Sequence, residues 1–272
     1  MQQNTMAESL IYLHIPKTGG TTLRGIIDRQ YKPGEFLIIE GARSGNFPRR
    51  VREITEERLK SVKVMAGHMD VGIHEYLPCS ATYFTLLREP VDRLVSLYYF
   101  IKRKPADPHH QLLNESNMSL KDFVLSGMRI NFNNGQARAI AGANYIDTEY
   151  GKCSREMLEA AKENLHKYFS LVGTTEQFDQ TVMLLRKKLN WDLPIYGRQE
   201  NVSQVRIAVE ELPKQTLEVM LELNQIDIEL HKYAGEILQG LIAKEPDSFL
   251  TEVKEFKTKN NMCKIIPQRL IK

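Results

Sequence analysis

The sequence predicts an α/β fold in which helices cover both faces of a mostly parallel β-sheet. Short apolar runs have the length of buried strands, and amphipathic segments of helical length stand between them. Strands that alternate with helices form parallel sheets, because the chain must cross over before each new strand starts in the same direction. The predicted strands span residues 10–15, 36–40, 62–66, 82–87 and 170–173.

Helices are predicted wherever apolar residues recur every three or four positions. The predicted helices span residues 21–30, 55–61, 91–102, 119–126, 155–168, 177–189 and a long region 214–242. From about residue 244 the chain is charged and only weakly periodic, which indicates a tail packed on the surface. We therefore expect one domain over residues 1–245, followed by this tail over residues 246–272.

Composition limits the classes of function. The 272 residues are 42% apolar and 26% charged, which is ordinary for one globular domain with a full core. A net charge of +3 is too small to indicate a nucleic-acid partner. No apolar run approaches the roughly 18 residues of a membrane span, and the first residues do not resemble a signal peptide. Cys79, Cys153 and Cys263 match neither a disulfide framework nor a zinc site, so we expect a reducing, cytoplasmic location.

The stretch between residues 14 and 22 has the composition of an anion-binding loop. It joins the first predicted strand to the first predicted helix and has the sequence His14-Ile15-Pro16-Lys17-Thr18-Gly19-Gly20-Thr21-Thr22. Glycines let the backbone approach a ligand closely, and the first N–H groups of the following helix point at the bound charge. Lys17 precedes both glycines, whereas a Walker A loop places its lysine after the second glycine. The loop is therefore not the ordinary ATP-binding loop.

A second candidate anion site follows the predicted strand 82–87. Arg88 stands at its end, where a guanidinium can grip a phosphate with two parallel hydrogen bonds. Pro90 suits the first turn of the next helix, because its missing N–H costs nothing there. Ser96 lies about two turns into that helix, where its hydroxyl can complete the grip. The structural alternative for Arg88 is an ion pair with Glu89 or Asp92.

These two sites carry a family resemblance. The segment from Pro16 to Thr22 resembles the 5′-phosphosulfate loop of sulfotransferases that use 3′-phosphoadenosine 5′-phosphosulfate (PAPS), and it is most similar to the carbohydrate-type and bacterial branch. The pattern from Arg88 through Pro90 to Ser96 resembles the 3′-phosphate signature of the same family. The resemblance spans about residues 10–240 and implies the P-loop-like sulfotransferase fold. It also implies PAPS as donor and 3′-phosphoadenosine 5′-phosphate (PAP) as product, with no metal.

The resemblance implies roles for individual residues. His68 follows the predicted strand 62–66 in a Gly-His context, where similar enzymes place a catalytic histidine; the alternative is a hydrogen-bonded structural histidine. Lys17 and His68 are the implied catalytic residues. The implied donor-binding residues are Lys17, Thr18, Gly19, Gly20, Thr21, Thr22, Arg88 and Ser96. Asn134, Gln136 and Arg138 resemble an Asn-x-Gln-x-Arg element of bacterial relatives and are expected either to bind the substrate or to pack a helix. Residues 196–203 resemble a late loop that closes over the nucleotide.

The predicted activity is transfer of a sulfuryl group from PAPS to an acceptor hydroxyl, most simply on a carbohydrate or glycolipid. Lys17 would stabilise the leaving group, and His68 would take the acceptor proton. One alternative is an enzyme similar to a P-loop kinase or NTPase, and another is a non-catalytic protein that binds PAP. The identity of the acceptor and the oligomeric state stay open, because fold does not specify substrate.

Overall fold

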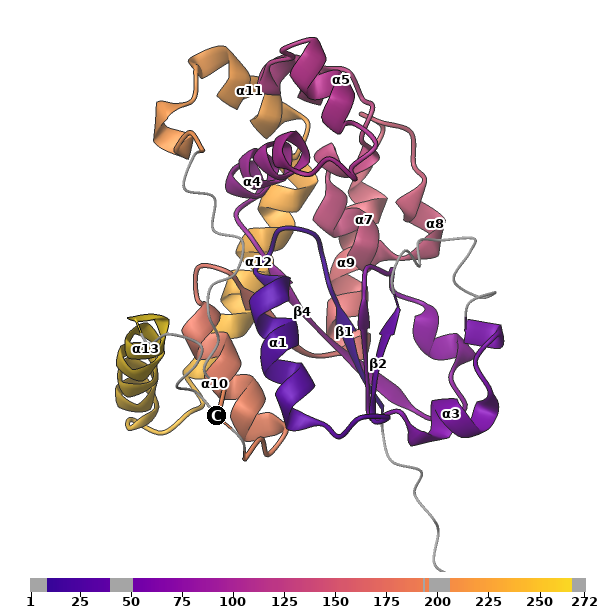
Figure 1. The fold of residues 1–272 in the computed structure, drawn as a ribbon, viewed down its shortest axis with the longest axis vertical. Coiled ribbons are helices and arrows are strands. Elements are labelled where there is room, and N and C mark those ends of the chain that lie inside the picture. Colours follow the sequence, from indigo (N-terminus) through magenta and orange to yellow (C-terminus); the bar gives the residue numbers. More distant parts are fainter. Residues whose placement is uncertain (1–8, 40–50, 193, 196–205, 266–272) are drawn as a thin grey trace, which may run out of the picture.

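A computed structural model describes residues 9–39, 51–192, 194–195 and 206–265. At its centre lies a five-stranded sheet in the order β2-β3-β1-β4-β5, and every neighbouring pair is parallel (Figure 1). The strands are β1 (Ser9–Leu13), β2 (Phe36–Ile39), β3 (Val64–Gly67), β4 (Ala81–Leu87) and β5 (Phe169–Thr174). The predicted α/β class and parallel sheet are confirmed, with each strand within two residues of its predicted position.

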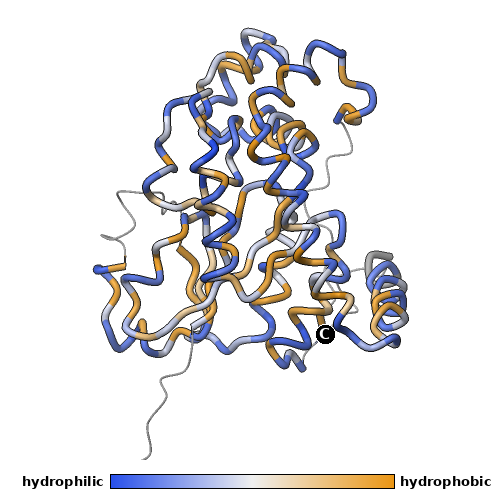
Figure 2. The backbone as a smooth tube through the Cα atoms, turned by 180° about the vertical axis from the view of Figure 1, so that it is seen from behind, coloured by the Kyte–Doolittle hydropathy of each residue, from blue (hydrophilic) through white to orange (hydrophobic). Residues whose placement is uncertain are grey.

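Both faces of the sheet are apolar because alternate residues of each strand point to opposite sides. In β1, Ile11 and Leu13 enter one buried cluster, whereas Leu10 and Tyr12 enter another on the opposite face. Figure 2 shows the apolar residues concentrated along the strands, with hydrophilic residues along the outer turns of the helices. This two-sided burial explains why the strands appear in the sequence as continuous apolar runs.

Helices cover each face. The first cluster packs against α7 (Gly135–Ala141), α9 (Arg155–Tyr168) and the first half of α12 (Gln225–Ile242). The second packs against α1 (Gly20–Gln30), α10 (Phe178–Lys188) and α13 (Phe249–Ile265). Shorter elements are α3 (Glu56–Ser61), η1 (Ile73–Tyr76), α8 (Ala143–Ile146) and η3 (Val209–Glu211). No helix within the described ranges has both the length and the apolar character needed to cross a membrane.

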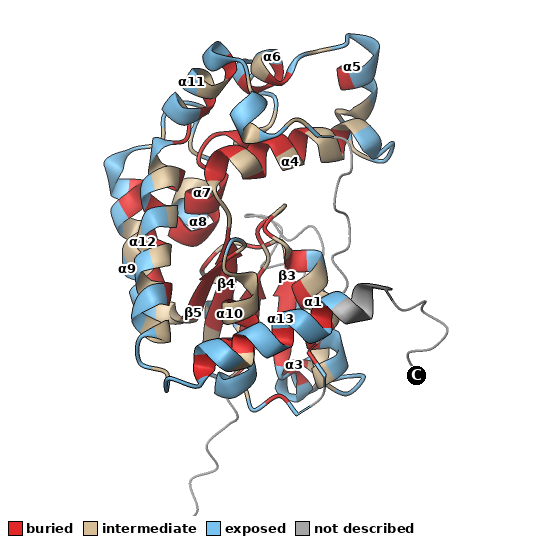
Figure 3. Ribbon diagram, turned by 90° about the vertical axis from the view of Figure 1, so that its left-hand side faces the viewer, coloured by how far each residue is buried: buried red, intermediate tan, exposed pale blue. Residues whose placement is uncertain are grey.

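A third cluster forms a helical cap beyond the carboxyl ends of the strands (Figure 3). It joins α4 (Pro90–Arg103), α5 (His110–Glu115), α6 (Leu120–Leu125), η2 (Ile130–Phe132) and α11 (Lys214–Glu222). The buried side of α4 enters the cap, so its other side is available to the edge of the sheet below it. The cap therefore places α4 across the loops that leave the strands.

The short helices α5 and α8 lie where no helix was predicted, and two longer stretches also differ from the sequence prediction. The region 214–242 is two helices, because Asn224 interrupts it: its amide donates to the carbonyl oxygens of Phe132 and Met220, at 3.0 Å and 2.9 Å. Residues 249–265 form a helix despite their weak periodicity. Phe249, Val253 and Phe256 are buried against the same cluster as α10, so the packing of these three side chains accounts for the helix.

Candidate active site

The loops that carry the candidate catalytic and binding residues meet at one edge of the sheet. Parallel register pairs Leu13 with Gly67 on one side and with Thr85 on the other. The loops that follow β1, β3 and β4 consequently leave the sheet together, and they carry Lys17, His68 and Arg88 to the same edge. Ligands of parallel α/β sheets bind at this carboxyl edge.

The loop after β1 is built to present backbone N–H groups. Lys17 and Gly19 have left-handed backbone conformations, with φ of 71° and 81°, and Gly20 is the first residue of α1. The first N–H groups of the helix, which begins at Gly20, point out of its amino-terminal end. Together with the positive end of the helix dipole they form a site for an anionic group.

The loop is packed against His14. A Cβ added to Gly20 would lie 1.9 Å from His14 Nε2, so only glycine fits over the imidazole ring. Thr18 is fully buried, and its hydroxyl donates to the Ile15 carbonyl at 2.9 Å. The Thr18 hydroxyl thus makes a contact inside the loop, and the Thr18 carbonyl accepts from the Thr175 hydroxyl at 3.1 Å. Thr21 is exposed at the helix start, and Thr22 is half-buried beside it.

Arg88 links the two predicted anion sites. Its Nη1 donates to the Lys17 carbonyl at 3.0 Å, which fixes the strained backbone of the loop. Its Nε and Nη2 donate to Asp92 Oδ2 at 2.7 Å and 2.5 Å, and Asp92 Oδ1 accepts a bond from Arg206 at 2.6 Å. The ion pair with Asp92 that the sequence allowed thus forms, while the same guanidinium stands at the mouth of the loop.

Lys17 lies in a cationic, aromatic environment. Its Nζ is 4.4 Å from the centroid of the Phe100 ring, a distance typical of a cation–π contact. Burial is the largest cause that lowers the pKa of Lys17 to about 8. The other causes are positive charges nearby, which belong to Arg88, Arg103, Arg206 and Lys104. The positive potential that these four cations create at Lys17 favours a ligand with several negative charges.

Ser96 lies on α4 between Asp92, which binds Arg88, and Phe100, which contacts Lys17. Asp92, Ser96 and Phe100 follow one another at intervals of four residues and so share one face of the helix. Asp92 holds Arg88 at one end of this face, and Phe100 holds Lys17 at the other. Ser96 is half-buried midway along it.

His68 has the tautomer of a proton acceptor. Its Nδ1 is 2.7 Å from the His14 carbonyl oxygen, and because a carbonyl only accepts, Nδ1 carries the hydrogen. When this ring is neutral, its lone pair is therefore at Nε2. The ring stacks on that of His14, with centroids 4.4 Å apart. Burial, followed by the charges of His68, Arg24 and Lys17, lowers the pKa of His14 to about 3, so His14 is neutral and supports the loop.

Comparison with known proteins identifies the family. The family model described as the sulfotransferase family matches residues 5–234. The chain belongs to the sulfotransferase family. The heparan sulfate 2-O-sulfotransferase hst-2 of Caenorhabditis elegans is 27% identical over 201 residues, covering 66% of this chain and 60% of the relative. Human galactose-3-O-sulfotransferase 3 is 25% identical over 201 residues, covering 68% of this chain and 45% of the relative.

Human heparan-sulfate 6-O-sulfotransferase 1 is also similar, at 25% identity over 181 residues, which cover 58% of this chain and 43% of the relative. This member of the sulfotransferase family thus spans about half of the length of the curated relatives it matches.

Asn134 and Gln136, at the start of α7, form hydrogen bonds that support the backbone of the site. Gln136 is fully buried, and its amide clamps the backbone of Arg88: Oε1 accepts from the Arg88 N–H and Nε2 donates to the Arg88 carbonyl, both at 2.9 Å. Asn134 Oδ1 accepts from the Asp227 N–H at 3.0 Å, and Asp227 in turn accepts from the first N–H groups of α7. These contacts favour the packing alternative over substrate binding for Asn134 and Gln136.

Arg138 and Asn131 line a cavity beside His68, together with Asp70. Arg138 is buried and donates to the carbonyl oxygens of Asn133 and Thr148, so it joins the segment before α7 to the segment after α8. Asn131 is 7% exposed, and its amide oxygen and nitrogen have no hydrogen-bond partner among the described residues. Nothing in the local sequence distinguished Asn131 from its neighbours.

Further contributors come from outside the predicted motifs. Phe100 contacts Lys17 and Arg206 binds Asp92, and no local pattern marks either one as functional. The predicted closing loop at residues 196–203 lies outside the described residues. Among the described residues, no group of histidine, cysteine and carboxylate side chains is arranged to hold a metal ion.

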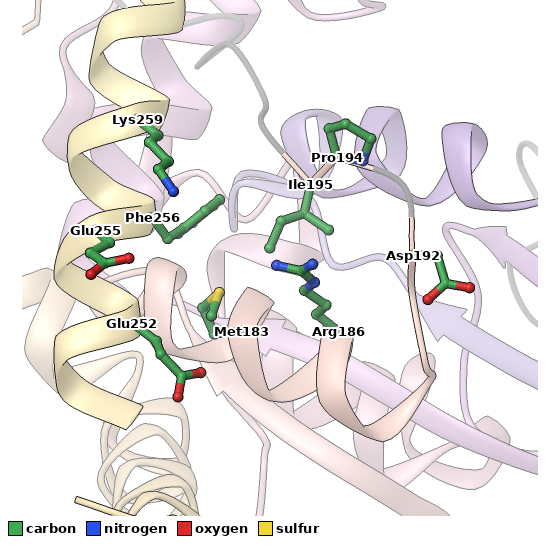
Figure 4. A pocket seen from close by; sticks show the side chains of 9 residues that line it. All are labelled: Met183, Arg186, Asp192, Pro194, Ile195, Glu252, Glu255, Phe256 and Lys259. Atoms are coloured by element: carbon green, nitrogen blue, oxygen red, sulfur yellow. The ribbon is translucent and has the colours of Figure 1, made fainter. Parts of the chain in front are cut away.

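A separate hollow lies between α10 and α13 (Figure 4). Its floor is apolar, its rim carries charges of both signs, and none of the residues that line it belongs to the loops described above. The lining residues are Met183, Arg186, Asp192, Pro194, Ile195, Glu252, Glu255, Phe256 and Lys259. The mixed charges favour no single class of ligand.

Proposed function

We propose that this protein transfers a sulfuryl group from PAPS to a hydroxyl group of a carbohydrate or glycolipid. The observation that carries the proposal is the convergence of Lys17, Arg88 and three further cations on the glycine loop at the carboxyl edge of the sheet. A donor with a 5′-phosphosulfate and a 3′-phosphate supplies negative charge at both ends of this surface. The names of the relatives, two heparan sulfate enzymes and one galactose enzyme, support a carbohydrate acceptor.

The residues present fit such a donor. The N–H groups from Gly19 to Thr22 would hold the 5′-phosphate and sulfonate oxygens, and Arg88 with Ser96 would hold the 3′-phosphate. Asp92 occupies the Arg88 guanidinium in the structure, so the 3′-phosphate would share or replace that carboxylate. Arg206, bound to the same carboxylate, would then face the donor as well.

In the reaction, the bond between sulfur and the bridging phosphate oxygen breaks as a bond forms between sulfur and the acceptor oxygen. Negative charge grows on the bridging oxygen in the transition state, and the ammonium group of Lys17 would stabilise it there more than in the ground state. Nε2 of His68 would take the acceptor proton, because Nδ1 already donates to the His14 carbonyl. The products are PAP and a sulfate ester.

Calorimetric titration with PAP, adenosine 5′-phosphosulfate and ATP, each with and without Mg²⁺, tests the donor. We expect the strongest binding for PAP, independent of Mg²⁺. A preference for ATP with Mg²⁺, or no nucleotide binding at all, would overturn the proposal in favour of a kinase-like protein or a protein without this ligand.

The base is tested separately with His68→Ala. We expect this variant to bind PAP like the unmodified protein and to lose transfer by about 100-fold to 10,000-fold, the range typical of a general base. His166→Ala, on the exposed face of α9, is the matched control. Unchanged transfer in His68→Ala would point to another base. Binding of PAP by the unmodified protein without any transfer would point to a non-catalytic role.

A further inference from the structure

A groove lies next to the cavity beside His68 and runs along η1 and α8. Asp70 lines both the cavity and the groove. Asp70 is two residues from His68, so the groove begins within about 7 Å of the proposed base along the chain. Between the two hollows the backbone is fixed, since the N–H of Val71 donates to the Ala139 carbonyl at 3.0 Å. The groove is thus the neighbouring hollow that a chain extending from a sugar at His68 would reach across Asp70.

The groove combines aromatic rings with short polar side chains. Tyr76 is 38% exposed, and the ring of His74 packs on that of Tyr168, with centroids 4.4 Å apart. The hydroxyl of Tyr83 accepts from the N–H groups of Gly72 and His74, at 3.3 Å and 3.1 Å, and this pair of bonds holds the turn that presents the rings. Ring faces beside amide and carboxylate groups suit a sugar, which offers apolar C–H faces and hydroxyl edges.

The charge of the groove is opposite to that of the donor site. Asp70 and Glu75 are acidic, and no lysine or arginine is among the described residues that line the groove. Lys167 lies over the ring of Tyr168, at 5.0 Å from the centroid, but does not line the groove. Burial lowers the pKa of His74 from its usual value, so at neutral pH this histidine adds no positive charge.

We infer that the groove is an acceptor-chain site and that it selects an uncharged oligosaccharide over a polyanionic one. The inference rests on the proposed function and narrows its acceptor class, since the relatives act on both kinds of glycan by their names. Like charges brought together at an interface disfavour binding of the wrong partner. A chain rich in carboxylates or sulfates would bring its charges against Asp70 and Glu75.

The test compares kcat/KM at saturating PAPS for three acceptors: a neutral galactose-terminated tetrasaccharide, the corresponding methyl monosaccharide, and a tetrasaccharide with alternating uronic acids. We expect the neutral tetrasaccharide to exceed the monosaccharide by about tenfold and the uronate chain by more than that. A preference for the uronate chain, or equal rates for the neutral tetrasaccharide and the monosaccharide, would overturn the inference.

Two variants locate the effect. Tyr76→Ala should lower kcat/KM for the neutral tetrasaccharide about tenfold more than for the monosaccharide. Glu75→Lys, at an exposed position, should raise kcat/KM for the uronate chain by about fivefold to tenfold. Glu218→Lys, on the exposed side of α11, makes the same change in net charge away from the groove and should leave all three rates as they are. Equal effects of the two lysine substitutions would contradict a local role for the groove.

The outcomes separate the two proposals. If the unmodified protein binds PAP but sulfates neither class of oligosaccharide, the inference about the groove fails and the donor assignment stands. If it does not bind PAP, the proposed function itself fails.

Discussion

Arg88 donates a hydrogen bond from Nη1 to the carbonyl oxygen of Lys17 at 3.0 Å. This bond joins the end of β4 to the loop after β1 and holds Lys17 in its left-handed conformation. Behind it, the amide of Gln136 fixes the backbone of Arg88 from both sides. The proposed 5′-phosphosulfate contact of the Lys17 loop and the proposed 3′-phosphate contact of Arg88 are thus joined by one hydrogen bond, so a substitution at either residue should change the position of the other.

Lys17→Ala tests the proposed stabilisation of the leaving group. Because the ammonium would act mainly in the transition state, we expect turnover to fall by about 100-fold to 1,000-fold with a much smaller change in the Kd of PAP. The matched control is Lys104→Ala, because Lys104 lies 5.1 Å from the same Phe100 ring. Similar losses of turnover in the two variants would mean that turnover depends on the total positive charge of this surface and not on the position of Lys17.

The pH dependence of donor binding should follow Lys17. Its pKa is about 8 in the free protein, so the ammonium group is charged below pH 8 and neutral above it. An anionic nucleotide favours the charged form, so the Kd of PAP should rise as the pH increases through 8, and binding near pH 8.5 should take up a proton. Calorimetry in buffers of different ionisation enthalpy measures that proton. Lys17→Ala should lack both effects; their persistence in this variant would assign them to another group.

The same shift has a consequence for stability. An unfolded lysine titrates near 10.5, so between pH 8 and 10.5 the unfolded chain holds a proton that the folded protein has lost. The contribution of Lys17 to the free energy of unfolding therefore rises with pH across this window. Urea unfolding of the unmodified protein and of Lys17→Ala, at pH 7.5 and pH 9.5, measures the difference. A flat or falling difference would contradict the lowered pKa.

Arg88→Ala should weaken PAP more than nucleotides without a 3′-phosphate. Loss of a charged hydrogen-bond pair corresponds to about 10-fold to 100-fold in Kd. The affinity for adenosine 5′-phosphate should fall less, because this nucleotide is affected only by the loss of the bond from Arg88 to the Lys17 carbonyl. Arg155→Ala, on the exposed surface of α9, serves as the control for charge. An equal loss for both nucleotides would remove Arg88 from the 3′-phosphate and leave it as a support for the loop.

Gly20→Ala tests the packing of the loop on His14. The new methyl group would meet the imidazole, so we expect a loss of about 1–3 kcal/mol in the free energy of unfolding, together with weaker PAP binding. In the double variant Gly20→Ala with His14→Ala the ring is gone, and the added cost of the methyl group should largely disappear. Strictly additive effects in this double-mutant cycle would show that the two residues do not compete for the same space.

Local pattern determined the strands, the parallel sheet, the glycine loop and the positions of Lys17, His68 and Arg88. Buried strand length, helical period and loop chemistry are set by residues close together in sequence, and parallel register then brings every strand end to one edge. Tertiary structure decided what these residues touch. Gln136 reaches Arg88 across 48 residues, and Arg206 reaches Asp92 across 114.

The break at Asn224, the helix at 249–265 and the acidic groove through Asp70 and Glu75 were likewise decided by packing between distant segments. These features depend on contacts between groups that lie far apart in sequence and meet only in the folded protein. No local periodicity or residue spacing could therefore predict them.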